Sequence, residues 1–266
     1  MTTPEGQPEA AGNGYVAAEV EWEPVVPEQS PLTPVFDEVT RRRTAEIIAR
    51  YPQSRSALLP LLHLVQSVEG YVSQDGIRYC AEVLELSTAE VSAVATFYTM
   101  YKRTPCGEHL VSVCTNTLCA ALGGDEIYAR LSQRLGVGHE ETAGEPGTPG
   151  SVTLEHAECL AACDFAPVLQ VNYEYFDNQT SESATALVDA LRRGERPMPS
   201  RGAPLTDLRT VELELAGIFP DLAAAVTGNS MAPETLRGAH MATQHGWTAP
   251  AMPDAPPALP NVPEKK

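Results

Sequence analysis

The chain has 266 residues and a formal net charge of −17. This acidic balance argues against nucleic-acid binding, because phosphate contacts require a basic face and dominate the affinity of such proteins. The longest apolar runs, such as residues 91–98, are much shorter than the roughly 18–20 residues that span a bilayer, so we expect no direct membrane insertion. Residues 1–40 contain eight Asp or Glu and no Lys or Arg, which is unlike a targeting signal and favours a cytoplasmic location.

Proline and small polar residues mark both ends of the chain. Of the 23 prolines, 17 lie in residues 1–35 or 195–266. Segments of this composition bury too little apolar surface to fold alone. We therefore predict a disordered N-terminal tail over residues 1–33. We also predict an extended Pro-rich tail over residues 195–266, disordered or wrapped around partners, with one apolar piece at 211–219 suited to docking.

Residues 34–104 have the pattern of a small helical bundle. Apolar residues recur at helical spacing in four segments, at about 34–51, 56–69, 74–84 and 87–98. Pro34 indicates the start of the first helix, and Gly70 ends the second. Ser87 and Glu90 form the pattern of a capping box at the start of the fourth. Four short helices joined by short links predict a bundle.

Residues 105–194 change to alternating strand and helix patterns. Strands are predicted at 109–113, 151–156, 168–171 and 172–176, and helices at 125–135 and 182–193. Residues 136–150 have the composition of a loop rich in Gly, Pro and Glu. The order β-α-β-β-β-α is typical of a small sheet covered by helices, as in thioredoxin-like proteins. The predicted fold class is therefore α+β, a helical bundle followed by a thioredoxin-like domain.

Four of the six cysteines form two short clusters, Cys114 with Cys119 and Cys159 with Cys163. In a reducing compartment, clustered cysteines are more often metal ligands than disulfides. Each cluster follows a predicted strand, and a right-handed crossover makes these two strands parallel, so both loops should open at one edge of the sheet. Four thiolates there would form a soft, anionic pocket suited to iron–sulfur or zinc.

Three interpretations of this pocket compete: a [2Fe–2S] cluster, a structural zinc ion, and cysteines that are structural or disulfide-bonded. Zinc sites most often pair cysteines two residues apart, whereas here four and three residues separate the members of each pair. The spacing favours iron–sulfur and leaves the other two open. Glu158 and Asp164 flank the second pair, and their negative charge should lower the reduction potential of a cluster.

Other candidate residues are assigned to packing or given no role. We predict that Cys80 packs in a helical core and that Cys106 is not a ligand. His109 and His156 lie near strand ends, but four cysteines already satisfy the metal, so we predict that neither is a ligand. The chain lacks the glycine-rich nucleotide motifs and the serine elbow, so we assign no catalytic residue.

Segments around the cysteines resemble a known family. Residues 114–119 with Gly123, and residues 158–172, resemble the two halves of the [2Fe–2S] motif in the E-subunit family of NADH–quinone oxidoreductase, the small [2Fe–2S] subunits of respiratory complex I. Residues 62–66 and 93–101 resemble the same family, and the match extends over roughly residues 36–194.

This resemblance implies a thioredoxin-like ferredoxin domain whose Cys114, Cys119, Cys159 and Cys163 ligate one [2Fe–2S] cluster. It implies a partner subunit that holds FMN and binds NADH, with other peripheral-arm subunits beside it. The chain would transfer electrons within a proton-pumping oxidoreductase. It would lie peripherally on the cytoplasmic face of a bacterial plasma membrane, held there by the complex.

Two alternatives remain beside this expectation. The equivalent subunit of an NAD-linked hydrogenase or formate dehydrogenase shares both cysteine pairs, and a zinc-stabilised interaction module belongs to a different class. Ala161 stands where the family often has Gly, and we expect its Cβ to be tolerated if φ is negative. The sequence does not decide the isomer of the bond before Pro167.

Overall fold

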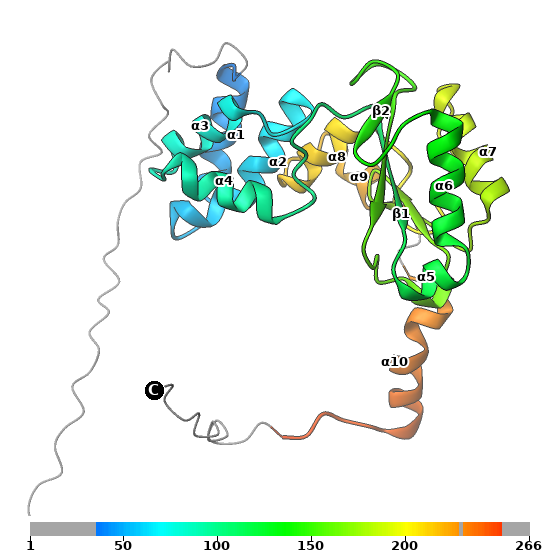
Figure 1. Cartoon of the computed structure of the whole chain (residues 1–266). Helices are drawn as coiled ribbons and strands as arrows, with labels where there is room; N and C mark the ends of the chain where they lie inside the picture. Colours follow the sequence, from blue (N-terminus) through cyan, green and yellow to red (C-terminus); the bar gives the residue numbers. More distant parts are fainter. Residues whose placement is uncertain (1–35, 229–230, 252–266) are drawn as a thin grey trace, which may run out of the picture.

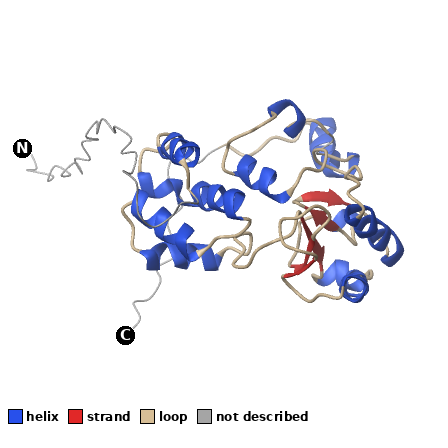
Figure 2. Cartoon of the chain, turned by 90° about the horizontal axis from the view of Figure 1, so that it is seen from above, coloured by secondary structure: helices blue, strands red, loops and turns tan. Residues whose placement is uncertain are grey.

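A computed structural model describes residues 36–228 and 231–251. The chain forms a helical lobe and a lobe built on a sheet, which lie side by side (Figures 1 and 2). The tail predicted over residues 1–33 lies outside the described residues. None of the described helices is both long enough and apolar enough to cross a membrane.

The helical lobe contains the four predicted helices. They are α1 (Glu38–Ile48), α2 (Leu58–Glu69), which follows a 3-10 turn (Ser54–Ala57), α3 (Gln74–Val83) and α4 (Thr88–Phe97). The first begins at Glu38, where the Asp37 side chain caps it by accepting from the Thr40 amide at 2.8 Å; Pro34, the predicted start, lies outside the described residues. Gly70 ends α2 in the left-handed region with φ +83°, as predicted.

The sheet lobe contains one more strand than predicted. The strands are β1 (His109–Cys114), β2 (Glu141–Ala143), β3 (Val152–Ala157), β4 (Leu169–Val171) and β5 (Glu174–Phe176). Their order is β2-β3-β1-β4-β5; β1 and β3 are parallel and the other pairs antiparallel. The sequence pattern misses β2 because it is a three-residue edge strand inside a Gly- and Pro-rich loop. It pairs with β3, and the Thr142 and Thr153 hydroxyls lie 2.7 Å apart.

Helices α5 (Thr117–Ala121), α6 (Gly124–Leu135) and α7 (Ser181–Arg192) complete this lobe. α6 and α7 pack against each other and against β3, and α6 also contacts β1 (Figure 1). The core between them is built from inward-facing aliphatic side chains such as Val111, Leu131, Leu154 and Leu191. Burial of such side chains contributes roughly 1.5–3 kcal/mol each. This core fixes the positions of β1 and β3.

A further helix, α8 (Leu208–Leu215), lies between the two lobes and corrects the prediction of an extended tail from residue 195. The Asp207 side chain caps it by accepting from the Thr210 amide at 3.0 Å. Leu208 and Glu212 are buried, and α8 packs on α2. The composition of residues 195–266 hides this helix because its buried stripe is short, but the apolar piece at 211–219 does dock as predicted, with Leu213, Ala216 and Ile218 packed on the helical core.

Glu212 of α8 joins the two lobes through a fully buried carboxylate. One oxygen lies 2.5 Å from Nδ1 of His63 on α2, and the other accepts from the Tyr173 hydroxyl at 3.0 Å, in the turn between β4 and β5. A buried carboxylate is tolerated only when such partners satisfy it. The relative position of the lobes therefore depends on this helix.

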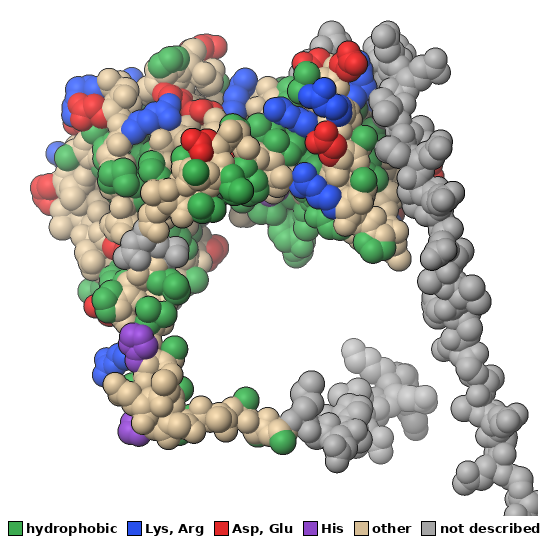
Figure 3. All heavy atoms as spheres, turned by 180° about the vertical axis from the view of Figure 1, so that it is seen from behind, with side chains coloured by type: hydrophobic (Ala, Val, Ile, Leu, Met, Phe, Trp, Pro, Cys, Tyr) green, Lys and Arg blue, Asp and Glu red, His purple; other side chains and the backbone are tan. Residues whose placement is uncertain are grey.

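The chain continues into α9 (Leu222–Ala225) and α10 (Pro233–His245). Helix α10 runs away from the body of the molecule (Figure 1) and forms a projecting arm in the view from behind (Figure 3); none of its side chains is buried. The extended-tail prediction therefore also misses these two helices. They contribute little to the core of either lobe.

We predict that Glu212→Ala strongly destabilises the protein. The substitution leaves the buried His63 ring and the Tyr173 hydroxyl without their partner, at about 1–3 kcal/mol for each unsatisfied group, so we expect a loss of roughly 2 kcal/mol or more in the free energy of urea unfolding. Glu214→Ala, on the same helix but partly exposed, should have a much smaller effect. Equal losses in both variants would contradict the role given to Glu212.

A second prediction concerns acid stability. The Ser87 amide and hydroxyl and the Arg55 guanidinium lower the pKa of Glu90 from 4.5 to about 2. Because the folded-state pKa lies below the unfolded one, this contribution is complete above about pH 4.5 and is lost as the pH falls toward 2. Carboxyl titration by NMR should show a midpoint near 2 for Glu90, and Glu90→Gln should flatten the pH dependence of stability in that window. A midpoint near 4.5 would contradict the capping geometry.

Candidate metal centre

The two cysteine loops leave the sheet at the same edge. β1 ends at Cys114, whose partner in the parallel β3 is Ala157, the last residue of that strand. The Thr115 amide and hydroxyl donate to the Ala157 carbonyl at 3.0 and 3.3 Å, so the two loops start side by side. The carboxyl ends of neighbouring parallel strands necessarily meet in this way.

The first loop is compact and buries its thiols. Cys114 and Cys119 are each only 2 % exposed. Helix α6 starts directly against them because Gly124 has no side chain. A Cβ there would lie 2.5 Å from the Cys114 carbonyl oxygen and 2.9 Å from the Cys119 backbone. Gly123, with φ +109°, provides the left-handed turn that precedes the helix.

The second loop is open to solvent. Cys159 and Cys163 are both exposed, and their sulfur atoms lie 3.7 Å apart. The Ala161 amide donates to Sγ of Cys159 at 3.4 Å. Two sulfurs bound to one tetrahedral metal with bonds of about 2.3 Å would be separated by about 3.8 Å, so this pair fits a shared metal.

The four thiols influence one another. Burial raises the pKa of Cys119 to about 11, and the hydrogen bond to Cys114 and the charges of Cys114 and Cys163 add to this effect. The hydrogen bond to Cys159 and its charge raise the pKa of Cys163, with a further contribution from Cys114. Cys114 and Cys119 also pack in one buried cluster with Ala162 of the second loop, so the two loops are in contact. Four neighbouring thiolates repel one another, so all four thiols ionise only if a positive charge lies between them. A bound metal supplies this charge.

Two pairs of thiols on adjacent loops fit a thiolate-bound metal cluster by the chemistry of their donors. Within the described residues, no three His, Cys, Asp or Glu side chains are grouped closely enough to hold a single metal ion, so the fit rests on the two cysteine pairs and their donor chemistry and not on a preformed four-thiol cage. Cys114, Cys119, Cys159 and Cys163 would hold the cluster, which supplies one-electron redox chemistry.

The residues assigned to packing lie elsewhere or make other contacts. Cys80 is fully buried in the helical core, and Cys106 packs against Leu110 and Leu208 near the junction of the lobes. His109 is buried and contacts Glu108 at 3.5 Å. The ring of His156 contacts the ring of His139 in a tilted arrangement, with ring centroids 4.2 Å apart.

Ala161 corrects an expectation. Its φ is +56°, in the left-handed region, so its Cβ is strained rather than accommodated with negative φ. This conformation turns the Ala161 amide toward Sγ of Cys159. The Ala166–Pro167 peptide bond, which the sequence does not decide, is cis.

Two residues that hold the second loop could not be predicted from the sequence pattern. The Asn116 side chain donates to Glu158 at 3.0 Å and ties the two loops together. The Tyr175 hydroxyl donates to the Leu160 carbonyl at 2.8 Å. These contacts join segments far apart in the chain, and no local pattern marks them.

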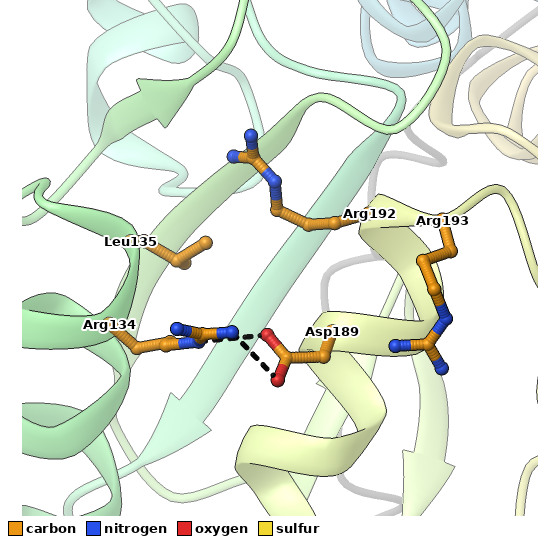
Figure 4. A pocket seen from close by; sticks show the side chains of 5 residues that line it. All are labelled: Arg134, Leu135, Asp189, Arg192 and Arg193. Atoms are coloured by element: carbon orange, nitrogen blue, oxygen red, sulfur yellow. Dashed lines mark hydrogen bonds and ion pairs between the residues drawn. The ribbon is translucent and has the colours of Figure 1, made fainter.

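Of two cavities on the described part of the chain, one adjoins the cysteine loops. One of about 330 Å³ adjoins Cys159 and Leu160 and extends to Met100 of the helical lobe. The other, about 480 Å³, lies at the ends of α6 and α7 (Figure 4). It holds the exposed pair Arg134–Asp189, with contacts of 2.9 and 3.1 Å. It is at the far end of α6 from the cysteines, so only the first cavity belongs to the site.

Comparisons with known proteins identify the family to which the chain belongs. Residues 44–192 match the family described as thioredoxin-like [2Fe–2S] ferredoxin. The chain is 55 % identical over 210 residues to the E subunit of NADH-quinone oxidoreductase from Mycobacterium bovis, covering 79 % of this chain and 81 % of that protein. It is 38 % identical over 160 residues to the protein of the same name from Rickettsia bellii, covering 59 % and 93 %.

A more distant likeness is to a chain of an NAD⁺-reducing [NiFe]-hydrogenase, at 16 % identity and a TM-score of 0.45, covering 52 % of this chain and 23 % of that one. It is too remote to bear on fold or function. The matched region and the relatives place the chain among iron–sulfur electron carriers. The chain belongs to the thioredoxin-like [2Fe–2S] ferredoxin family.

We predict that Ala161→Gly stabilises the protein, because glycine adopts φ +56° without a steric penalty. The expected gain in thermal unfolding is roughly 1 kcal/mol. Ala162→Gly is the matched control: Ala162 has φ −122° and is buried, so its replacement should destabilise. A loss of stability in Ala161→Gly would show that the loop is not strained at this residue.

Proposed function

We propose that this chain is the [2Fe–2S] electron-transfer subunit of the NADH-oxidising module of a proton-pumping NADH:quinone oxidoreductase. One observation carries the proposal: two cysteine pairs converge on one sheet edge, in a chain 55 % identical to an E subunit of NADH-quinone oxidoreductase. The fold positions these thiols, and we assign no catalytic group to the chain itself.

The two pairs have different roles in this proposal. Cys114 and Cys119 bind from inside the domain, where burial protects the cluster from water. Cys159 and Cys163 bind from the exposed loop, so electrons enter and leave on that side. The Ala161 amide donates to Cys159 and stabilises negative charge on its sulfur.

A partner subunit that holds FMN and binds NADH completes the function. NADH gives up a hydride, which carries two electrons, whereas a [2Fe–2S] cluster takes one, and a flavin bridges the two chemistries. Exposed Leu118 and Leu122, beside Cys119, and the cavity beside Cys159 support docking of this partner on the cysteine edge. Exposed Phe97 and helix α10 are surfaces for other peripheral-arm subunits.

In this assembly the chain lies on the cytoplasmic face of the membrane, held there by its partners. The level of identity to E subunits of NADH-quinone oxidoreductase favours this assignment over a hydrogenase or formate dehydrogenase subunit. The family match likewise disfavours a zinc-stabilised interaction module.

Cysteine substitutions with iron and sulfide analysis test the proposal. The full chain purified without oxygen should contain about two irons and two sulfides and give a rhombic electron paramagnetic resonance (EPR) signal when reduced. Cys119→Ala should lose most of the iron because it removes a ligand.

Cys80→Ala is the matched control, because Cys80 is equally buried but lies in the helical lobe. It should keep the iron. Similar iron loss in both variants, or a colourless wild-type protein with one zinc, would contradict the proposal.

A further inference from the structure

Arg201 lies against the second cysteine loop although it follows α7 in the chain. Its guanidinium carbon is 4.4 Å from the centre of the Tyr175 ring and 5.1 Å from that of Phe165. Its side chain is only 14 % exposed. Cation–π contacts are strongest when partly desolvated, as here.

The orientation of Arg201 is fixed by its other contacts. Asp177 accepts two hydrogen bonds from its guanidinium, at 2.7 and 2.8 Å. The Tyr175 amide donates to the Arg201 carbonyl at 3.1 Å, and an antiparallel bridge joins these two residues. The two hydrogen bonds to Asp177 fix the plane of the guanidinium, and the backbone bridge to Tyr175 fixes the start of the side chain. Together they keep the guanidinium over the two rings.

Both rings belong to the surroundings of the exposed thiols. Phe165 follows Cys163 by two residues, in the 3-10 turn Cys163–Phe165. The Tyr175 hydroxyl holds the carbonyl of Leu160, the residue after Cys159. Arg201 thus contacts one end of the loop directly and the other through Tyr175.

The loop needs such support. Its two cysteines are exposed, and Ala161 between them is in a strained conformation. An exposed loop makes few contacts of its own, and these do not offset the free-energy cost of a strained residue. Residues outside the loop must therefore pack against it to keep this conformation. Arg201 lies beyond residues 44–192, the region that matches the family, so this support comes from outside that region.

We propose that Arg201 is a positioning residue for the cluster: it braces the loop of Cys159 and Cys163 through Tyr175 and Phe165 and places positive charge beside the site. The inference rests on the proposed function. A positive charge there favours the reduced, more anionic cluster. Replacing Arg201 by a neutral residue removes this charge and leaves the Asp177 carboxylate without its partner.

Three variants of the full chain test this inference, with cluster loss to a chelator and reduction potential as measurements. Arg201→Gln should lose the cluster roughly three- to tenfold faster, as expected from the loss of two cation–π contacts. Its potential should shift to lower values. Arg201→Lys keeps the charge and should restore the potential, while cluster loss stays between the two.

Arg196→Gln is the control for general loosening of the segment after α7. Arg196 contacts Glu108 at 3.1 Å and the Leu205 carbonyl at 3.3 Å, away from the cysteine loop. This variant should match the wild type in both measurements.

If the wild type holds the cluster but Arg201→Gln behaves like it, or if Arg196→Gln gives the same changes, the inference about Arg201 is wrong and the proposed function stands. A wild type without a cluster would overturn both.

Discussion

The parallel pairing of β1 with β3 is the contact on which the candidate site depends. It brings the end of β1, at Cys114, beside the end of β3, at Ala157, and so sets two loops with four thiols at one edge. α6 crosses between the two strands and packs on both, and the aliphatic core beneath it holds their register. A one-residue slip in this pairing would turn every side chain to the opposite face and separate the thiols.

Burial divides the site into two unlike halves. The first pair is enclosed by the start of α6, where Gly124 permits the closest approach. The second pair is exposed on a loop containing a strained alanine. An enclosed half protects a cluster, and an open half gives electrons a short path to a partner. Function thus requires an exposed loop, and stability requires contacts that hold it, such as those of Tyr175 and Arg201.

Sequence patterns predict the parts of the fold that local interactions determine. The helices of residues 34–104 are predictable because their apolar spacing and caps are local, and the meeting of the cysteine loops follows from chain order and the handedness of the crossover. Strand β2 is missed because three residues carry no periodic signal. Helix α8 is missed because the composition of the whole segment outweighs one short buried stripe, and the φ of Ala161 and the contacts of Arg201 depend on tertiary packing.

The central claim is that Cys114, Cys119, Cys159 and Cys163 together hold two bridged irons. The most direct measurement is a crystal structure of the protein purified without oxygen, with anomalous diffraction recorded at the iron and zinc absorption edges. The account predicts two neighbouring iron peaks between the four sulfurs and no peak at the zinc edge. A single zinc peak there, or a disulfide between Cys159 and Cys163 with no metal, would contradict it.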